Sequence, residues 1–291
     1  MNQDSLPAII VISSHVVRGT VGNRAAVFAL ESLGFPVWAV PTVLLPWHPG
    51  HGRATRIVPD AAEFAAMMDD LSKAPWLSEV GAVLSGYLGD GAQASSIAKL
   101  IGAVKKQNPK ATYLCDPVIG DEGGLYVPEA TAIAIRDQLL PLADIATPNR
   151  FELAWLTNTK LDDNQAIMNA ADELVAPIVI TTSAIAMMNG STGNLLTNEQ
   201  ETVMAEHRLV QGPTNGLGDL TSALFLARYL MGDTNEKALR HTTAAVFETL
   251  ARAAKRGSSE LMLASDASAL AHPMAMVQMR RMMRVQPKSL A

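Results

Sequence analysis

Residues 211–230 read QGPTNGLGDLTSALFLARYL, a glycine-rich loop that runs directly into an apolar stretch with helical character. Gly216 and Gly218 flank Leu217, and glycines allow the backbone to turn successive N–H groups towards one point. The start of a helix also carries a partial positive charge. The loop and the helix start together therefore predict an anion-binding site.

Asp219 follows these glycines, and two roles are open to it. Aspartate is common as a helix cap, where its carboxylate accepts a backbone N–H. Beside a bound phosphate the same carboxylate would be a catalytic base. The stretch is neither a Walker A loop, since the chain has no GxxxxGK[ST], nor a dinucleotide fingerprint, since Thr221 stands in place of the third glycine.

Short apolar runs alternate with helical patterns along the rest of the chain. The strand-like runs are AIIVI (8–12), VWAV (37–40), GAVLSG (81–86), ATYLC (111–115) and IVITT (178–182). Helical periodicity covers residues 60–71, 94–106 and 234–255, and Pro128 is predicted as the first residue of a further helix. This alternation predicts an α/β fold with a central, mostly parallel sheet and helices on both faces. In such sheets ligands bind beyond the carboxyl ends of the strands.

The composition favours one cytoplasmic domain. A length of 291 residues allows one or two domains, but no linker, repeat or change of composition divides the chain. We therefore expect a single domain over residues 1–291, with roughly the last ten residues as a flexible tail. One cysteine excludes an internal disulfide and a multi-cysteine zinc site, which suits a reducing compartment. Cys115 itself is expected to be a small buried apolar residue.

The charge pattern excludes several classes of partner. The net charge is −5 and the pI is near 5.7, without a basic run, so nucleic acid is not expected as a partner. No segment approaches the roughly 18 apolar residues that a membrane span requires. The N-terminus lacks the cationic region of a signal peptide and reads as a first strand. The segment AMVQMRRMMR (275–284) is expected to be a packed or solvated tail, not a membrane helix.

Acidic residues follow two of the strand-like runs. In CDPVIGDEGGLYV (115–127), Asp116 comes directly after a strand, and Asp121 and Glu122 follow. Carboxylates at a strand end suit Mg²⁺, but Asp-Pro and Asp-Glu-Gly-Gly are equally ordinary turn sequences. In DIATPNRFELAWL (144–156), Glu152 is either favoured by the helix dipole or a metal ligand. The residues leave both alternatives open.

Two further segments, SSHVVRGTVGN (13–23) and LSGYLG (84–89), complete a series of five in a fixed order. With them the chain resembles the pyridoxal kinases of the ribokinase-like superfamily from Ser13 to about Arg256. The motifs that carry the resemblance are SSHVVRGTVGNRAA, SGYLG, CDPVIGD, TPNRFEL and GLGD.

The resemblance implies ATP-dependent phosphorylation of the 5′-hydroxymethyl group of pyridoxal and related vitamers by a ribokinase-like homodimer. It makes Asp219 the catalytic base and gives the anion hole to the backbone of Gly216, Leu217 and Gly218. Vitamer contacts fall on Ser14, His48 and Tyr87, and ATP contacts on Asp116, Asn149, Thr181 and Thr182. Asp116 and Glu152 would hold Mg²⁺, the latter often through water, and K⁺ is a possible further cofactor.

The sequence departs from the family pattern at two places. Leu217 replaces a threonine or other small residue and so removes a hydroxyl that could assist the phosphate or a monovalent cation. Around His48 the family usually has Ser-Asn-His-Thr, whereas this chain has Pro46, Trp47, His48 and Pro49, which stiffens the loop that covers the vitamer. His48 and His51 lack the further ligands of a metal site.

Three other functions remain as alternatives: a hydroxymethylpyrimidine kinase, a sugar kinase, and a vitamer-binding protein with little turnover. Ser14 and Tyr87 speak against a sugar, whose hydroxyls would need more carboxylates and amides. Asp219 beside an intact glycine pair speaks against a pure binder, which has no use for a base.

Overall fold

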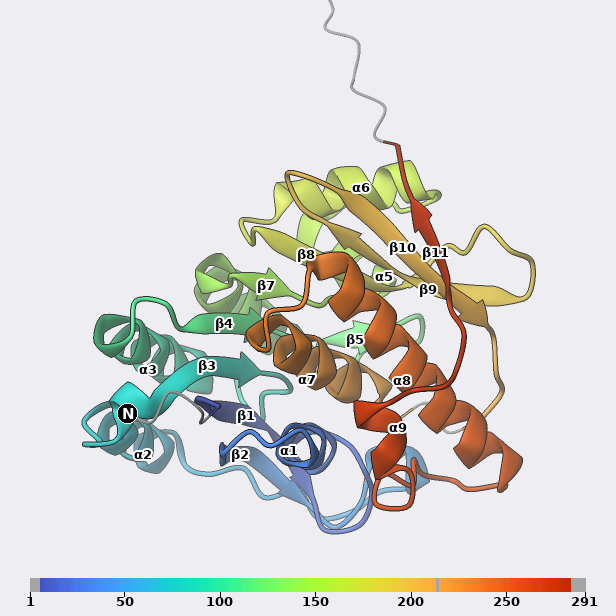
Figure 1. Cartoon of the computed structure of the whole chain (residues 1–291). Helices are drawn as coiled ribbons and strands as arrows, with labels where there is room; N and C mark the ends of the chain where they lie inside the picture. Colours follow the sequence, from blue (N-terminus) through green and yellow to red (C-terminus); the bar gives the residue numbers. More distant parts are fainter. Residues whose placement is uncertain (1–5, 213–214, 284–291) are drawn as a thin grey trace, which may run out of the picture.

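The computed structural model describes residues 6–212 and 215–283, and within them nine strands form one sheet (Figure 1). Its order is β11-β10-β9-β8-β7-β4-β3-β1-β2. The mutually parallel strands are β1 (Ala8–Val16), β2 (Val37–Leu45), β3 (Val80–Ser85), β4 (Thr112–Cys115), β7 (Ile145–Ala146) and β8 (Ile178–Ala184). Antiparallel pairing extends one edge through β9 (Ser191–Thr197), β10 (Thr202–Arg208) and β11 (Gln278–Arg281).

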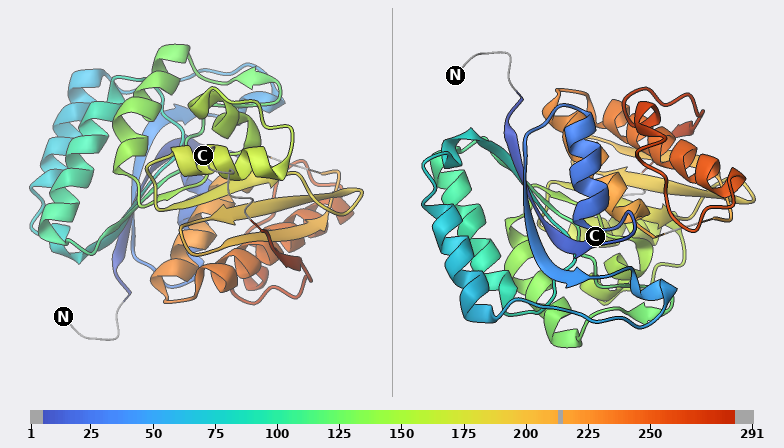
Figure 2. Two further views of the ribbon diagram at one scale, coloured as in Figure 1. Left: turned by 90° about the horizontal axis from the view of Figure 1, so that it is seen from above. Right: turned by 90° about the horizontal axis from the view of Figure 1, so that it is seen from below.

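Helices cover both faces of the sheet (Figure 2). One face carries α2 (Ala61–Ser72), α3 (Gln93–Gln107), α4 (Glu129–Ala134), α5 (Arg150–Thr157) and α6 (Asn164–Glu173). The other carries α1 (Asn23–Ser32), α7 (Leu217–Leu230), α8 (Asn235–Lys255) and α9 (Ala267–Ala271). Strand β1 shows why both faces need cover, because Ile10 packs into the core on one face and Ile9 into the core on the other. The predicted α/β architecture is confirmed.

Short elements lie between these helices and strands. A two-stranded ribbon, β5 (Gly120–Asp121) and β6 (Gly124–Leu125), follows β4. Single helical turns occur at Pro49–His51, Leu77–Glu79, Ile135–Leu139 and Leu140–Leu142. No helix of the described residues is long and apolar enough to cross a membrane.

Side-chain caps set the ends of the predicted helices. Asp60 accepts the N–H of Ala62 at 2.8 Å and starts α2, and Thr234 accepts the N–H of Lys237 at 3.3 Å and starts α8. The prediction for Pro128 is wrong by one residue. Its ψ of 143° is extended, so it occupies the cap position and α4 begins at the following residue.

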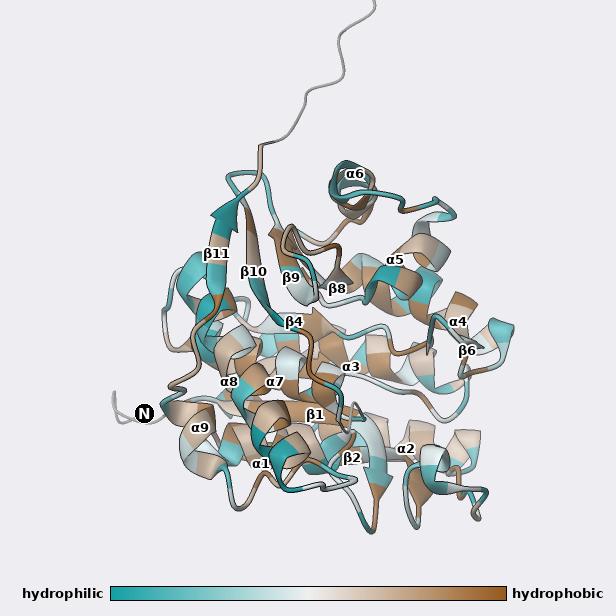
Figure 3. Ribbon diagram, turned by 90° about the vertical axis from the view of Figure 1, so that its right-hand side faces the viewer, coloured by the Kyte–Doolittle hydropathy of each residue, from teal (hydrophilic) through white to brown (hydrophobic). Residues whose placement is uncertain are grey.

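The C-terminal segment forms an edge strand. Strand β11 pairs with β10, and Arg280 Nε lies 2.9 Å from the buried carboxylate Oε2 of Glu206. The strand is hydrophilic (Figure 3), as an edge strand often is. Of the tail expected to be packed or solvated, residues 278–281 form β11 and Met276 and Met283 are exposed. Residues 284–291, predicted as flexible, lie outside the described residues.

Candidate active site

The start of α7 is shaped by Gly216. This residue occupies the cap position with φ 83° and ψ 0°, and Leu220 N–H donates to its carbonyl at 3.0 Å. A Cβ added to Gly216 would lie 2.0 Å from the carbonyl oxygen of Thr20, so no other residue fits this approach. The N–H groups in the first turn of a helix have no intrahelical partner. The backbone of Leu217 and Gly218 is therefore available to an anion.

Asp219 is not the cap of this helix, and the capping interpretation is wrong. It is the third residue of α7, and its Oδ2 accepts the N–H of Gly22 at 2.8 Å. Burial raises the pKa of the Asp219 carboxyl, while the N–H groups of Gly22 and of Asp219 itself oppose this rise. Asp219 is thus partly exposed, and its carboxylate is held by Gly22, a residue 197 positions earlier in the sequence.

The loop after β1 reaches Asp219 through a close contact with its own strand. Gly22, with φ 55°, pairs with His15, and a Cβ at Gly22 would lie 2.2 Å from the carbonyl oxygen and 2.3 Å from the hydroxyl of Ser14. This contact places the largely buried Ser14 next to the group that binds Asp219.

The end of β3 approaches the same point. Tyr87 N–H donates to Ser13 Oγ at 3.2 Å, and the Tyr87 carbonyl accepts from Thr42 Oγ1 at 2.7 Å. A Cβ on the preceding Gly86 would lie 3.8 Å from Asp219 Oδ1. The structure therefore brings Tyr87, Ser14 and Asp219 together at the carboxyl ends of the strands.

Asp116, at the end of β4, is linked to α7. It is 4% exposed, and its Oδ2 accepts from Ser222 Oγ at 2.9 Å, one turn beyond Asp219. Thr147 Oγ1 lies 2.8 Å from the same hydroxyl. Burial and then the negative charge of Asp219 raise the pKa of Asp116 to about 7, against the effect of both hydroxyls. Burial and the neighbouring carboxylate of Asp219 therefore both favour the neutral form of Asp116.

Glu152 forms a capping box with Asn149 at the start of α5. Asn149 Oδ1 accepts Glu152 N–H at 2.9 Å, and Glu152 Oε2 accepts Asn149 N–H at 2.8 Å. Glu152 Oε1 accepts the N–H of Ile119 at 3.0 Å and of Gly120 at 3.4 Å. Burial and then the charge of Asp116 raise the pKa of Glu152 well above its usual range, although these N–H groups oppose it. Glu152 thus has a structural role, and its metal role stays a prediction.

The other two acidic residues of the 115–127 segment form an ordinary turn. Asp121 Oδ1 accepts Gly123 N–H at 2.7 Å between β5 and β6, and Glu122 forms an ion pair with Arg150. Both side chains are exposed. Cys115 is fully buried as expected, and burial raises the pKa of its thiol to about 12.

His48 lies beside the glycine-rich loop. Its Nδ1 accepts Gly50 N–H at 3.1 Å, and a Cβ on Gly50 would lie 3.5 Å from Asn215 Nδ2, one residue before Gly216. Burial, together with the charge of His51, lowers the pKa of His48, although Glu260 opposes this change. The turn that carries His48 therefore borders the anion site.

The two threonines of β8 differ in placement. Thr182 is partly exposed, forms a bridge with Asn149 and donates its N–H to the carbonyl of Pro148 at 2.9 Å. Thr181 is fully buried, and its hydroxyl has no hydrogen-bond partner within the described residues. Asn149 and Thr182 thus lie side by side and partly exposed at the carboxyl end of the sheet, whereas Thr181 is buried.

Several residues that shape the candidate active site were not predicted from the sequence. Gly22, Gly86, Ser222 and Thr147 hold or border the two aspartates. Gly22 and Gly86 stand inside the quoted motifs, so a glycine beside a strand end was the available signal. Ser222 follows Asp219 by three residues, the spacing that places two side chains on one helix face.

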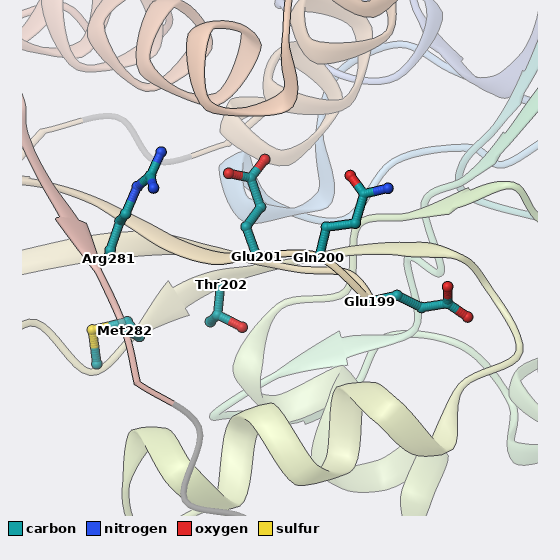
Figure 4. A pocket seen from close by; sticks show the side chains of 6 residues that line it. All are labelled: Glu199, Gln200, Glu201, Thr202, Arg281 and Met282. Atoms are coloured by element: carbon teal, nitrogen blue, oxygen red, sulfur yellow. The ribbon is translucent and has the colours of Figure 1, made fainter.

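A groove of about 280 Å³ lies elsewhere, between the β9–β10 turn and β11 (Figure 4). It is lined by Glu199, Gln200, Glu201, Thr202, Arg281 and Met282. Because Thr197 pairs with Val179 near the start of β8, this turn lies at the amino end of β8. The groove therefore lies at the amino ends of the parallel strands, whereas Asp219 lies at their carboxyl ends.

Comparisons with known proteins agree with this geometry. The family model described as phosphomethylpyrimidine kinase matches residues 54–264. Pyridoxal kinase PdxY of Rubrobacter xylanophilus is 34% identical over 288 residues, which cover 97% of this chain and 99% of that protein. Pyridoxal kinase PdxY of Corynebacterium diphtheriae is 34% identical, with 91% of this chain and 96% of that protein covered.

A solved structure gives the same result. Pyridoxal kinase from Leishmania donovani, in complex with ADP and pyridoxamine, aligns with a TM-score of 0.88 and 28% identity. The alignment covers 95% of this chain and 99% of the other. From its sequence and its fold, the chain belongs to the phosphomethylpyrimidine kinase family and, within it, to the pyridoxal kinases.

Proposed function

We propose that this protein transfers the γ-phosphoryl group of ATP to the 5′-hydroxymethyl group of pyridoxal and related vitamers, and so forms pyridoxal 5′-phosphate from pyridoxal. The observation that carries the proposal is the start of α7, where Asp219, held by Gly22, follows the N–H groups of Leu217 and Gly218. A base and an anion-binding backbone thus share one helix turn. The names of the relatives support a pyridoxal-type vitamer as the acceptor.

Asp219 acts on the hydroxyl of the substrate. It accepts the hydroxyl proton as the oxygen forms a bond to the γ-phosphorus, and the bond from that phosphorus to ADP breaks. Burial raises the pKa of Asp219 and so makes its carboxylate a stronger base. The N–H groups of residues 216–219 stabilise negative charge on the transferring group. Ser14, Tyr87 and His48 bind the vitamer around this point.

The residues around Asp116 fit Mg²⁺. Burial and then the charge of Asp219 raise the pKa of Asp116 to about 7, a cation would stabilise its ionised form, and Mg²⁺ takes one or two carboxylates together with waters and phosphates. Asp116 would hold the ion directly. Glu152, whose oxygens accept backbone N–H groups, would act through water. When bound, the ion neutralises phosphate charge.

The nucleotide is placed by neighbouring groups. Asn149 and Thr182 lie side by side for the triphosphate, with Thr181 buried behind them. Leu217 offers no hydroxyl to a monovalent cation, so we expect replacement of K⁺ by Na⁺ to change turnover little. A homodimer and a cytoplasmic location remain predictions, and light scattering of the purified protein tests the first.

An ATP-consumption assay across five acceptors tests the proposal: pyridoxal, pyridoxine, pyridoxamine, hydroxymethylpyrimidine and ribose. We expect turnover with the pyridoxal-type vitamers. Turnover with hydroxymethylpyrimidine alone would favour the second candidate, to which the name of the matching family model points. Turnover with ribose alone would identify a sugar kinase, and vitamer binding without turnover would identify a binding protein.

Removal of the base gives the sharpest test of the site. Asp219→Ala should lower kcat at least about a hundredfold, the usual scale for loss of a general base, while ATP still binds. Steady-state kinetics and ATP titration measure the two effects. The matched control is Asp121→Ala, which removes an exposed turn carboxylate and should keep kcat. Near-normal turnover in Asp219→Ala would show that another group is the base.

A further inference from the structure

Glu260, which follows α8, joins two loops that border the active site. Its side chain is 12% exposed, and its Oε1 lies 2.7 Å from His51 Nε2 and 3.7 Å from Arg18 Nη1. Its Oε2 accepts the N–H of Thr20 at 3.3 Å. One carboxylate therefore contacts both the loop after β1 and the turn after β2.

The loop after β1 is the one that holds Asp219. Thr20, whose N–H binds Glu260, also donates its hydroxyl to the carbonyl of Leu261 at 3.1 Å. The Thr20 carbonyl packs against Gly216, and two residues later Gly22 donates to Asp219. A continuous path of short contacts thus connects Glu260 to the carboxylate of Asp219 and to the start of the anion site.

The second contact reaches the turn over the vitamer. His51 ends the turn Pro49–His51, whose cap is His48, and Gly50 within it faces Asn215. The hydrogen bond between His51 and Glu260 therefore holds this turn close to the glycine-rich loop. Both loops that border the α7 start depend on the same side chain.

The surroundings of Glu260 are arranged for this contact. Gly19 has φ 117°, and a Cβ added there would lie 3.0 Å from Glu260 Oε1, so glycine permits the approach. Ser258 Oγ accepts the N–H of Glu260 at 3.2 Å and donates to its carbonyl at 2.7 Å, which fixes the backbone that presents the carboxylate.

We propose that Glu260 is a positioning residue for phosphoryl transfer: it fixes residues 18–22 so that Gly22 holds Asp219 in place, and it fixes His51 so that the 48–51 turn stays over the vitamer. This inference rests on the proposed role of Asp219 as the base. Glu260 does not touch the reacting atoms, and its effect comes through the loops it binds. Small displacements of a catalytic group are enough to cost large factors in rate.

A double-mutant cycle tests the path to Asp219. Glu260→Ala should lower kcat about tenfold or more in the wild-type background and have almost no effect on kcat in the Asp219→Ala background. A merely structural role would reduce activity by the same factor in both backgrounds. Glu260→Gln keeps an oxygen for Thr20 N–H and should recover much of the lost kcat. Glu260→Asp, which keeps the charge but shortens the reach, should resemble Glu260→Ala and replaces it if that variant does not fold.

The contact between Glu260 and His51, in the turn Pro49–His51, has its own test. His51→Ala removes the hydrogen bond to Glu260 but leaves the contact between Glu260 and Thr20. It should raise the KM for pyridoxal several-fold, by a larger factor than it lowers kcat. A kcat loss as large as that of Glu260→Ala with no change in KM would contradict the assignment of the His51 contact to vitamer binding and of the Thr20 contact to Asp219.

Glu248 provides a matched control. Its side chain is 10% exposed, and its Oε2 accepts the N–H groups of Met274 and Ala275 on a segment away from Asp219. Glu248→Ala should lower the Tm but keep kcat within about twofold. An active wild type with unchanged kcat in Glu260→Ala, or with equal losses in both backgrounds, would overturn this inference alone. A wild type without turnover on any vitamer would overturn the proposed function, and this inference with it.

Discussion

Among single residues, Asp116 shows a conflict between stability and function. Burial and the charge of Asp219 raise its pKa from an ordinary 3.8 to about 7. Between these two values the native state binds more protons than the unfolded chain, so the free energy of unfolding falls as the pH rises. The stabilising contribution of protonated Asp116 is complete below pH 3.8 and is lost above about pH 7. At neutral pH the metal-free protein therefore carries a destabilising carboxylate.

The variant Asp116→Asn should remove this destabilisation. Without Mg²⁺, at about pH 8, it should raise the free energy of unfolding by about 2 kcal/mol, and the gain should shrink towards about pH 4. Kinase activity should fall in the same variant. Thermal unfolding across this pH range measures the effect, with the exposed turn residue Asp121→Asn as control. A less stable Asp116→Asn protein at about pH 8 would contradict the argument.

Among the elements, α7 depends most on backbone geometry at its start. The left-handed Gly216 lets the helix begin against the carbonyl of Thr20, and this contact fixes both the anion-binding N–H groups and Asp219. The side chains of residues 220–227 of the same helix are then all buried. The N-terminal turn therefore combines a tight backbone contact with a firmly anchored helix.

A methyl group at position 216 should lower both stability and turnover. Gly216→Ala would place Cβ 2.0 Å from a backbone oxygen in a left-handed conformation, so we expect a loss of about 2 kcal/mol in stability. Displacement of the helix start should also reduce kcat about tenfold or more. Gly102→Ala, on an open face of α3, should be neutral or slightly stabilising. Chemical denaturation and kinetics of both variants make the comparison.

The strands that the sequence predicted contain short continuous apolar runs, such as AIIVI in β1, which packs into two cores. Strands β9, β10 and β11 were not predicted, because polar residues interrupt their sequences, although β9 and β10 are largely buried and only β11 lies at the sheet edge. Asp116 and Asp219 were found as candidates because each follows a recognisable strand end or loop. The contact of Gly22 with Asp219, and the whole role of Glu260, depend on tertiary packing that no local pattern indicates.

For the whole molecule, one sheet joins the two halves of the chain. Strand β1 and the last strand, β11, belong to it, and the site is built from both halves. The single domain over residues 1–291 stays a prediction, which an unfolding experiment can test. A single domain should lose its helices and its tertiary contacts in one cooperative transition.

The positions of the tryptophans make this testable. All four, at residues 38, 47, 76 and 155, lie in the first part of the chain, whereas the long helix α8 lies near the end. Unfolding curves from tryptophan fluorescence and from helical circular dichroism should therefore coincide in midpoint and slope. Two separated midpoints would indicate that the halves unfold independently.

The hydrogen bond between Gly22 and Asp219 spans 197 positions of sequence, and this separation governs when the protein becomes an enzyme. On the ribosome, the loop after β1 is made well before its partner in α7, and Glu260 is made later still. A nascent chain can thus present strand β1 without a positioned base. Premature termination before α7 would leave a fragment without Asp219, so the chain cannot become catalytic until α7 and Glu260 have been made.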